Sequence, residues 1–409
     1  MLKMTKADKR SSYFLSIGIL LLAFYAFSFL VPVLFLWCGQ AINETCFVVS
    51  ILLTIGSSFF IVKAFQKPKP LLLLGLNLVL AFIITISALI ALRFLDTTYD
   101  GQTYHLEAIM NLVNGWNPIH PESSLVDTSL WTSIHYPKAS WYAASNMIVY
   151  FNSIEIGKTY NLLLLFSSFF ISLATLKEVF NFKYPLATFL AVLISLNPIS
   201  GNQFLSFYLD GQIASLIIIL FGFFLLFLKS YPKNILLASM SLVFISLINL
   251  KFPSLVFAVI FCAGFVLFYL WKNDFKNIIK LPLLFGIVFL IGSFFIGYSP
   301  YFVNTFEYAH PFYPLNEVHL LEGGNQADNF NGTNRFYKLF HSLFSYQGCV
   351  VGEESTILKN PIIQGVMQTY KFPDTRIGGF GPYFGLIVLF SIFLVLLLIR
   401  VNKNKKIKI

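Results

Sequence analysis

The fold of this chain is decided at residues 71–107, where the apolar run LLLLGLNLVLAFIITISALIALRFL (71–95) passes directly into the polar segment DTTYDGQTYHLE (96–107). The apolar run is long enough to cross the hydrocarbon core of a bilayer, which takes about 20 residues. The polar segment holds acids, tyrosines and a histidine just where the chain leaves that run. We therefore predict a transmembrane helix that opens into a reaction site at the membrane surface.

The composition of the whole chain agrees with this interpretation. Of its 409 residues, 57% are hydrophobic and 11% are charged, whereas a soluble domain has roughly a quarter charged residues. We predict an all-α polytopic membrane protein that forms a single integral membrane domain over residues 1–409. The net charge of +10 does not indicate a nucleic-acid partner, because most Lys and Arg residues lie in short loops between apolar runs, where orientation signals are found. We expect no nucleic acid to bind.

Ten apolar runs have about the length of a membrane span, roughly 17–25 residues. They fall at approximately 12–37, 45–63, 71–95, 159–176, 184–200, 212–229, 234–250, 253–271, 281–299 and 382–400. The first run follows basic residues, as in a signal peptide, but it is too long for the apolar part of one and lacks a small-residue cleavage site. We interpret it as a retained helix that is bent at Pro32. The runs 184–200 and 234–250 are short and interrupted by polar residues.

The basic residues predict the orientation of these helices. With the amino terminus inside, the inner segments hold most of the Lys and Arg residues, including those of the tail 401–409, as the positive-inside rule requires. The topology is then N-in and C-in, with two long outer loops at about 96–158 and 300–381. All six histidines and most acids fall on the outer side. We expect a multi-pass protein of the plasma membrane, the inner membrane of a bacterium, with its active face outward.

The first outer loop has internal order. Asp100 is placed to cap a helix over 102–114, because a short carboxylate accepts hydrogen bonds from the free N–H groups of a first turn. The apolar stripe of this helix consists of Leu106, Ile109, Met110 and Val113. Gly115 can end it. A second helix, at about 139–151, is rich in aromatic residues at its start, and we expect it to lie in the plane of the membrane interface.

The triplet Asp100-Gly101-Gln102 recurs as Asp210-Gly211-Gln212. Each copy stands at the outer start of an expected helix. A single match of three residues is a weak argument for an internal duplication. We interpret the triplet as shared local geometry, with an acid that caps a helix and a glycine where the backbone must approach another group closely.

Three acids are candidates for chemistry. Asp100 is the leading candidate for a catalytic base, since a carboxylate at the membrane surface can take a proton from an acceptor hydroxyl. The alternative is that Asp100 only caps its helix, which is worth about 1 kcal/mol; the polar residues after it, including Tyr104 and His105, favour a function. Asp96 is the second candidate for the base. Asp210 is a candidate for contact with the substrate or, together with Asp100, for binding a divalent cation such as Mg or Mn.

Three outer cations are candidates for binding the phosphate of a leaving group, because an ammonium or guanidinium stabilises the charge that develops there. They are Lys138, Lys251 and Arg376. Lys251 lies between two helices with almost no connecting loop, so the alternative is that it reaches toward lipid phosphates. His105 and Tyr136 complete the set of expected substrate-binding residues.

Several other chemistries lack their motifs. The histidines have no HExxH-like or paired spacing, which argues against a dedicated zinc site. The chain has no Walker loop, no dinucleotide-binding glycine pattern and no nucleophile elbow. A sugar donor used at the outer face would therefore have to arrive attached to a lipid. Cys38 and Cys46 could pair if they face an oxidising compartment, and two free thiols are the alternative.

These features resemble the GT-C superfamily of glycosyltransferases, integral membrane enzymes that use sugars linked to polyprenyl phosphate or pyrophosphate. The likeness is to the dolichyl/undecaprenyl-phosphate mannosyltransferase and aminoarabinose-transferase group. In that group an acidic loop is followed by an interfacial helix and a Tyr-x-Lys-Pro-Pro motif. Here Tyr136-Pro137-Lys138-Ala139-Ser140 keeps the Tyr and the Lys but lacks the two prolines. The segment 150–158 looks like the turn to the next helix, with Lys158 where the family has Arg.

The resemblance covers the loop at 96–160 and the overall topology. Two helices precede the helix that leads into the acidic loop, whereas the family usually has one. The resemblance implies that Asp100 takes the position of the catalytic base and Lys138 that of a donor-phosphate ligand.

We therefore expect an inverting glycosyltransferase that moves a sugar from a polyprenyl-(pyro)phosphate carrier to a glycan, lipid or protein acceptor at the outer membrane face, in envelope polysaccharide, lipid or protein glycosylation. Its partners are the lipid-linked donor, the acceptor and the membrane lipids. The alternative is a membrane polysaccharide polymerase or a flippase for lipid-linked oligosaccharides. A flippase is expected to place charged residues inside its helices, and the apolar runs of this chain hold almost none.

Overall fold

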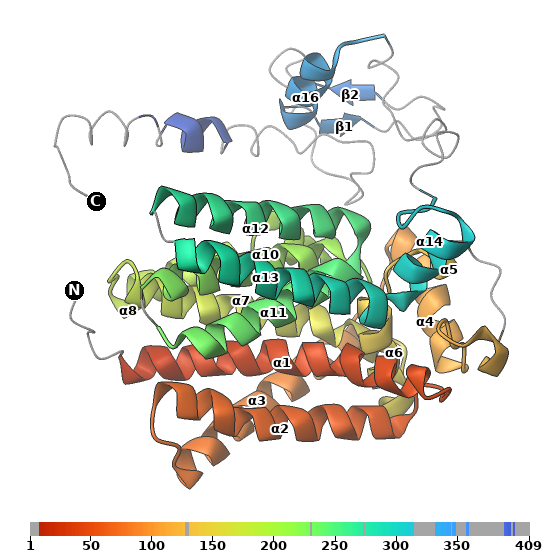
Figure 1. Cartoon of the computed structure of the whole chain (residues 1–409), viewed down its shortest axis with the longest axis horizontal. Helices are drawn as coiled ribbons and strands as arrows, with labels where there is room; N and C mark the ends of the chain where they lie inside the picture. Colours follow the sequence, from red (N-terminus) through yellow and green to blue (C-terminus); the bar gives the residue numbers. More distant parts are fainter. Residues whose placement is uncertain are drawn as a thin grey trace. The chain divides into compact units, whose positions relative to one another are not determined.

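The computed structural model describes residues 8–126, 131–229, 231–272, 275–314, 332–344, 346–348, 357–359, 388–393 and 396. The chain divides into two compact units, Met1–Asn316 and Glu317–Ile409. The first unit is a bundle of long helices that run side by side, with shorter helices gathered at one end (Figure 1). The expectation of one integral membrane domain over the whole chain stays a prediction.

The long helices of the first unit carry the apolar runs of the sequence. They are α1 (Lys9–Trp37), α2 (Glu44–Phe65), α3 (Pro70–Arg93), α7 (Thr159–Glu178), α10 (Asp210–Leu228), α11 (Lys233–Leu250), α12 (Phe252–Trp271) and α13 (Phe275–Leu290). The shorter elements are η1 (Gly101–His105), α4 (Leu106–Val113), η2 (Pro121–Ser123), α5 (Trp131–His135), α6 (Ala139–Phe151), η3 (Glu155–Lys158), α8 (Tyr184–Ser195), α9 (Pro198–Gln203), η4 (Ile291–Ile296), η5 (Tyr298–Phe302) and α14 (Val303–Glu307). Short polar side chains begin several helices: Asn43, for example, caps α2 by accepting from the N–H of Thr45 at 3.0 Å.

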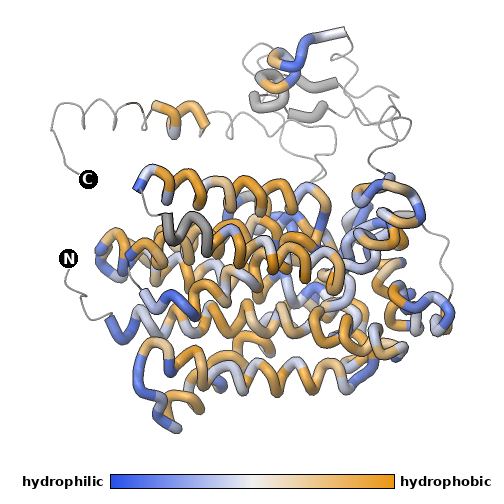
Figure 2. Tube along the Cα trace, in the orientation of Figure 1, coloured by the Kyte–Doolittle hydropathy of each residue, from blue (hydrophilic) through white to orange (hydrophobic). Residues whose placement is uncertain are grey.

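Within the described residues, seven helices are long and apolar enough to cross a membrane. They are α1, α2, α3, η3 continued by α7 (Glu155–Glu178), α10, α11 and α12. Apolar residues run along the length of these helices, and hydrophilic residues gather near their ends (Figure 2). The prediction of a helical multi-pass membrane protein is confirmed in this coarse form. The predicted count of ten spans and the N-in orientation stay predictions.

The predicted run 184–200 is not one continuous helix. It consists of α8 and α9, separated by a break at which the Asn197 side chain caps α9. The chain nevertheless passes from one end of the bundle to the other here. Tyr184 donates a hydrogen bond to the residue that caps the start of α1, whereas the carbonyl of Ser206 accepts one from Asn161 near the start of α7. Two short helices with a break between them therefore replace the single span that the sequence predicted.

The predicted run 281–299 is bent, because its helix does not continue straight into the second long loop. The segment Leu281–Ile296 meets the segment Tyr298–Glu307 at an angle of 89°. Of the predicted run 382–400, only residues 388–393 and 396 are described, and these are helical.

The centre of the bundle is formed by α1 and by α7 with the turn η3 before it. In the most apolar stretch of each of these spans 78% of the residues are buried, compared with 28% in α12. α1 packs against α7, which in turn packs against α10. At this seam Ile171 of α7 fits between two glycines. A Cβ atom on Gly18 of α1 would lie 2.6 Å from Ile171 Cγ1, and one on Gly222 of α10 would lie 2.8 Å from its Cγ2.

The helix predicted over 102–114 forms as η1 followed by α4. Gly115 has a φ of +98° and ends it, as predicted. The second helix of this loop, α6, corrects a prediction. Residues 139–148 of α6 are all buried, and Asn146 donates to the carbonyl of Ser28 within α1 at 3.1 Å. α6 is therefore packed into the bundle and does not lie in the membrane interface as a surface helix.

The described part of the second unit contains a helix, as expected for the second long loop, and two strands that the sequence did not predict. The helix α16 (Arg335–Phe344) precedes two short antiparallel strands, β1 (Tyr346–Gly348) and β2 (Ile357–Lys359). Tyr346 pairs with Lys359, and Gly348 pairs with Ile357. The described residues are thus predominantly helical, with one short pair of strands.

Candidate functional site

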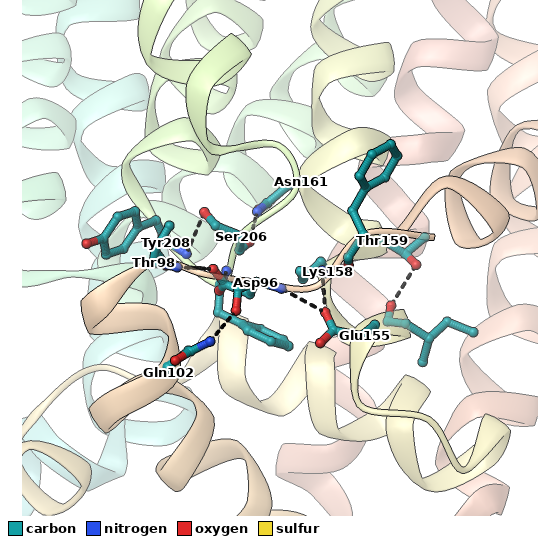
Figure 3. Close-up of polar contacts among 12 residues, drawn as sticks. Asp96, Thr98, Gln102, Glu155, Lys158, Thr159, Asn161, Ser206 and Tyr208 are labelled. Carbon is teal, nitrogen blue, oxygen red and sulfur yellow. Dashed lines mark hydrogen bonds and ion pairs between the residues drawn. The ribbon is translucent and has the colours of Figure 1, made fainter. Parts of the chain in front are cut away.

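Asp96 lies at a junction between several elements, and all of its polar atoms have partners (Figure 3). Its Oδ1 accepts from the N–H and the hydroxyl of Thr98 at 2.9 and 2.7 Å. Its Oδ2 accepts from the N–H of Phe207 at 2.7 Å. Its carbonyl accepts from the side chain of Gln102 at 2.6 Å, and its N–H donates to Glu155 at 3.3 Å. Asp96 is 5% exposed, and its polar atoms are used in hydrogen bonds within the fold.

A buried ion pair supports this junction. Lys158 is 1% exposed, forms an ion pair with Glu155 and donates a hydrogen bond to the carbonyl of Phe94. Lysine is almost never fully buried unless it has such a partner. Lys158, which stands where the GT-C group has Arg, therefore anchors the chain where it leaves α3.

The first Asp-Gly-Gln triplet begins the π-helical turn η1. Asp100 has helical dihedral angles, with φ −65° and ψ −31°, and its side chain makes no capping hydrogen bond, so the prediction that it caps this helix is wrong. Gly101 meets the close approach that the sequence predicted, because a Cβ atom there would lie 2.2 Å from Asp96 Oδ2. Gln102 reaches back to the carbonyl of Asp96. Asp100 itself is partly exposed.

The second triplet is the first turn of α10. Asp210 also makes no cap; its Oδ1 accepts from the ammonium of Lys251 at 3.0 Å. The backbone N–H of Gly211 donates to the side chain of Gln203 at 2.7 Å, and a Cβ atom on Gly211 would lie 3.3 Å from that side chain. Gln212 donates to the hydroxyl of Ser140 at 2.8 Å. Both triplets thus use the glycine for a close approach and the glutamine as an anchor.

The two triplets and Lys251 meet around a set of tyrosines. We use the term site cluster for Asp100, Tyr104, His105, Tyr136, Tyr208, Asp210 and Lys251. The rings of Tyr104 and Tyr136 are 6.0 Å apart. Burial raises the pKa of the Tyr104 hydroxyl, and the charges of Asp100 and Asp210 raise it further. Both carboxylates therefore act on the same phenol.

His105 is the buried member of the site cluster, with 3% of its surface exposed. Its Nδ1 accepts from the indole N–H of Trp141 at 2.9 Å. Burial and the nearby charge of Lys251 lower the pKa of His105 to about 3, although Asp210 opposes this shift. The ring is therefore neutral at pH 7, and in the neutral ring its Nε2 carries the proton.

Tyr136 and Lys138, neighbours in the sequence, have different surroundings. Tyr136 is partly exposed, and its pKa is raised by burial and by the charge of Asp100. Lys138 is 1% exposed; its ammonium donates to the carbonyls of Ile134 and Tyr136 at 2.9 and 2.8 Å and lies 5.7 Å from the ring centre of Trp116. Burial holds its pKa well below the ordinary value.

The structure brings together most of the predicted site residues. Asp100, His105, Tyr136, Asp210 and Lys251 belong to the site cluster, while Lys138 is enclosed beside it. Arg376 lies outside the described residues. Sequence reasoning missed Tyr208 and Trp141; the signal for Tyr208 was its place two residues before Asp210.

The donor set for a divalent cation is poor. No group of three or more His, Cys, Asp or Glu residues suited to a metal occurs in the described part of the chain. The Lys251 ammonium already occupies one oxygen of Asp210 and would repel a cation placed there. The predicted pairing of Asp100 with Asp210 around Mg or Mn therefore does not fit this arrangement well. Cys38, Cys46 and Cys262 are free thiols, with Cys38 exposed and Cys46 buried.

Comparisons with protein-family models, with curated proteins and with solved structures find no match to this chain.

Proposed function

We propose that this protein is an inverting glycosyltransferase that takes a sugar from a polyprenyl-(pyro)phosphate carrier and transfers it to an acceptor hydroxyl at the bundle end that holds the site cluster. The observation that supports this best is the convergence of Asp100, Asp210 and Lys251 from three separate segments of the chain around partly exposed tyrosines. A base, a cation and aromatic surfaces are what transfer of a sugar from a phosphate requires.

Each group has a defined task in this reaction. The Asp100 carboxylate takes the proton from the acceptor hydroxyl, and the oxygen attacks the anomeric carbon from the face opposite the phosphate. The bond between the anomeric carbon and the phosphate oxygen breaks, and its electron pair leaves with the phosphate. Lys251 stabilises the charge on that leaving group. One base and one good leaving group suffice, in contrast to the two carboxylates of glycoside hydrolysis.

Burial favours Asp100 over Asp96 as the base. Asp96 uses both carboxylate oxygens in hydrogen bonds within the fold and is buried. Asp100 is partly exposed and lies close enough to Tyr104 and Tyr136 to raise the pKa of both. We therefore assign the base to Asp100.

The same reasoning moves the phosphate ligand from Lys138 to Lys251. Lys138 is buried, with its ammonium on two backbone carbonyls, so a phosphate could reach it only after the loop rearranged. Lys251 has 36% of its side chain exposed and is held at the site by Asp210. A phosphate that approaches Lys251 would exchange one oxygen partner of the ammonium for another.

The first prediction concerns the base. Purified protein in nanodiscs is incubated with polyprenyl phosphates that carry radiolabelled sugars, together with a membrane extract as the source of acceptor. The Asp100→Asn variant is expected to lose transfer by about 100-fold or more, because general base catalysis contributes roughly 10²–10⁴-fold. Glu107→Gln is the matched control, since Glu107 is an exposed acid on the same helical segment, and it should transfer at the wild-type rate. Transfer by Asp100→Asn at the wild-type rate would contradict the assignment.

The length of the product separates this proposal from the alternatives. A transferase that adds one sugar yields a product extended by one unit, and a polysaccharide polymerase yields a ladder of products from the same site. A flippase moves the labelled lipid across the bilayer and forms no new glycosidic bond. The described spans carry charged residues only near their ends, which gives a flippase no charged passage.

A further inference from the structure

Asp96 connects the two parts of the site cluster that carry carboxylates. Through Oδ2 it holds the N–H of Phe207, three residues before Asp210. Through its carbonyl it holds the side chain of Gln102, two residues after Asp100. Asp96 therefore links two turns that lie far apart in the sequence.

Gly101 makes the connection tight. A Cβ atom at this position would lie 2.2 Å from Asp96 Oδ2 and 2.3 Å from the hydroxyl oxygen of Thr98. Real Cβ atoms essentially never approach so closely, so any other residue here would have to push the carboxylate away. The backbone of η1 therefore rests directly against the carboxylate that binds Phe207.

Further hydrogen bonds and an ion pair support the base of the junction. Glu155 accepts from the N–H of Asp96, and Lys158 links Glu155 to the carbonyl of Phe94. On the far side, Asn161 donates to the carbonyls of Gln203 and Ser206 and so fixes the segment before Phe207. Figure 3 shows Thr98, Gln102 and Glu155 around Asp96, with Lys158 beside Glu155 and Asn161 beside Ser206.

We propose that Asp96 is a positioning residue, whose carboxylate sets the separation between the turn that carries Asp100 and the turn that carries Asp210 and, through it, Lys251. The role of this separation in catalysis rests on the proposed function, because it places the base relative to the cation that receives the leaving phosphate. The connection between the two turns does not depend on that function and is measurable by itself.

A distance measurement tests the connection. Thr103 and Asn202 are exposed residues on the two sides of the junction; each is changed to Cys in a chain whose four native cysteines have been replaced, and both are spin-labelled. In nanodiscs the parent should give one narrow distance distribution. Asp96→Asn places an N–H group against the donors of Thr98 or Phe207, and Gly101→Ala displaces the carboxylate, so both variants should broaden or shift the distribution.

Asp8→Asn is the matched control for these variants. Asp8 is also a hydrogen-bonded carboxylate, which accepts from the N–H of Arg10 and from the hydroxyl of Tyr184, but it lies at the start of α1. Its replacement should leave the distance between positions 103 and 202 unchanged. A distribution that is unchanged in both Asp96→Asn and Gly101→Ala overturns the inference.

Kinetics separate positioning from general loss of fold. With the protein still folded, as judged by its melting temperature, Asp96→Asn should lower kcat on the order of 10–100-fold and change KM for the donor by less than about twofold, because misplacement of a catalytic group acts on the chemical step. Thr98→Val, which removes one donor to the carboxylate, should show a smaller loss that Thr98→Ser restores. An equal loss in Asp8→Asn would show a structural effect only and would overturn the positioning role.

If the wild type transfers no sugar while the distances respond as expected, the proposed function fails and the connection between the two turns stands.

Discussion

The protonation state of His105 is set by its surroundings and not by its place in a polar segment. The side chain is buried, accepts the indole N–H of Trp141 and lies near the charge of Lys251. Protonation would create a positive charge in a buried site and would break the hydrogen bond from Trp141. His105 is therefore a buried, neutral member of the site cluster, held by the hydrogen bond from Trp141.

This surrounding predicts a dependence of stability on pH. The pKa of His105 is about 3 in the folded protein, below the ordinary value of 6.5 for histidine. Between these values the unfolded chain therefore binds a proton that the folded chain does not. The stabilisation is complete above pH 6.5 and declines as the pH falls toward 3. The melting temperature in detergent should decrease on acidification below about pH 6.5.

The variant His105→Gln isolates this effect, because glutamine can accept from Trp141 but does not titrate. Its melting temperature should fall less steeply with acidification over the same range than that of the wild type. His135, whose pKa burial also lowers, contributes to the slope in both proteins and cancels in the comparison. Equal slopes in the two proteins would contradict the assignment of the effect to His105.

At the scale of elements, the π-helical turn η1 explains how one short segment serves two purposes. π-turns are rare and are frequent at functional sites. Here the turn lets Gly101 lie against Asp96 while Asp100 and Tyr104 stay at the site cluster. Hydrophobic periodicity predicts the helix around it but carries no signal for the extra residue in the turn.

The seam between α1, α7 and α10 is the element-scale feature that holds the bundle together. Small residues let helix backbones approach in a membrane, where packing replaces the hydrophobic driving force. Ile171 fills the space that Gly18 and Gly222 leave open on either side. Hydrogen bonds follow the same seam, since Ser167 donates to the carbonyl of Gly18 at 2.8 Å.

Added volume at this seam should destabilise the protein. Gly18→Ala and Gly222→Ala each place a methyl group against Ile171, and overpacking of this kind costs about 1–3 kcal/mol. Both variants should melt at lower temperature in detergent. Gly75→Ala in α3 is the control, because nothing lies within 4 Å of the added Cβ atom, and it should melt at or above the wild-type temperature. A normal melting temperature for Gly222→Ala would show that the seam can relax.

At the scale of the whole molecule, one end of the bundle collects the polar chemistry. The loop after α3, the segment before α10 and Lys251 all meet there. Asn117 also ties the first loop to the end of α1, by donating to the carbonyl of Leu36 at 3.0 Å. The positive-inside rule predicts that this end faces outward.

Cysteine labelling tests that orientation. Cys38 is an exposed free thiol next to the end of α1, and Lys67 is exposed in the short turn between α2 and α3. A membrane-impermeant maleimide should label Cys38 in intact spheroplasts of cells that express a variant with no other cysteine. Lys67→Cys, made in a chain with the native cysteines replaced, should be labelled only after permeabilisation. The reverse pattern would show that the site cluster faces inward.

The sequence by itself determined the features that depend on composition and local order. Apolar runs of about 20 residues favour helices in a bilayer, because a helix satisfies its backbone polar groups within the segment. The helices α1, α2, α3, α7, α10, α11 and α12 follow from such runs. The sequence also predicted close approaches at Gly101 and Gly211, the glycines of the two triplets, and the structure confirms both. Only the tertiary structure decided which charges meet.

Asp96 and Asp100 are both acids of the same short polar segment. Asp96 accepts a hydrogen bond from the N–H of Phe207 in a distant loop, whereas Asp100 lies in the site cluster. Lys138 and Lys251 both lie on the predicted outer side, yet of these two lysines Lys251 forms an ion pair with an acid, Asp210, and Lys138 donates to backbone carbonyls. The burial of α6 belongs with these, since it depends on Ser28 and the rest of α1. Each depends on contacts between residues far apart in the chain, and periodicity, capping and charge counting report only on neighbours.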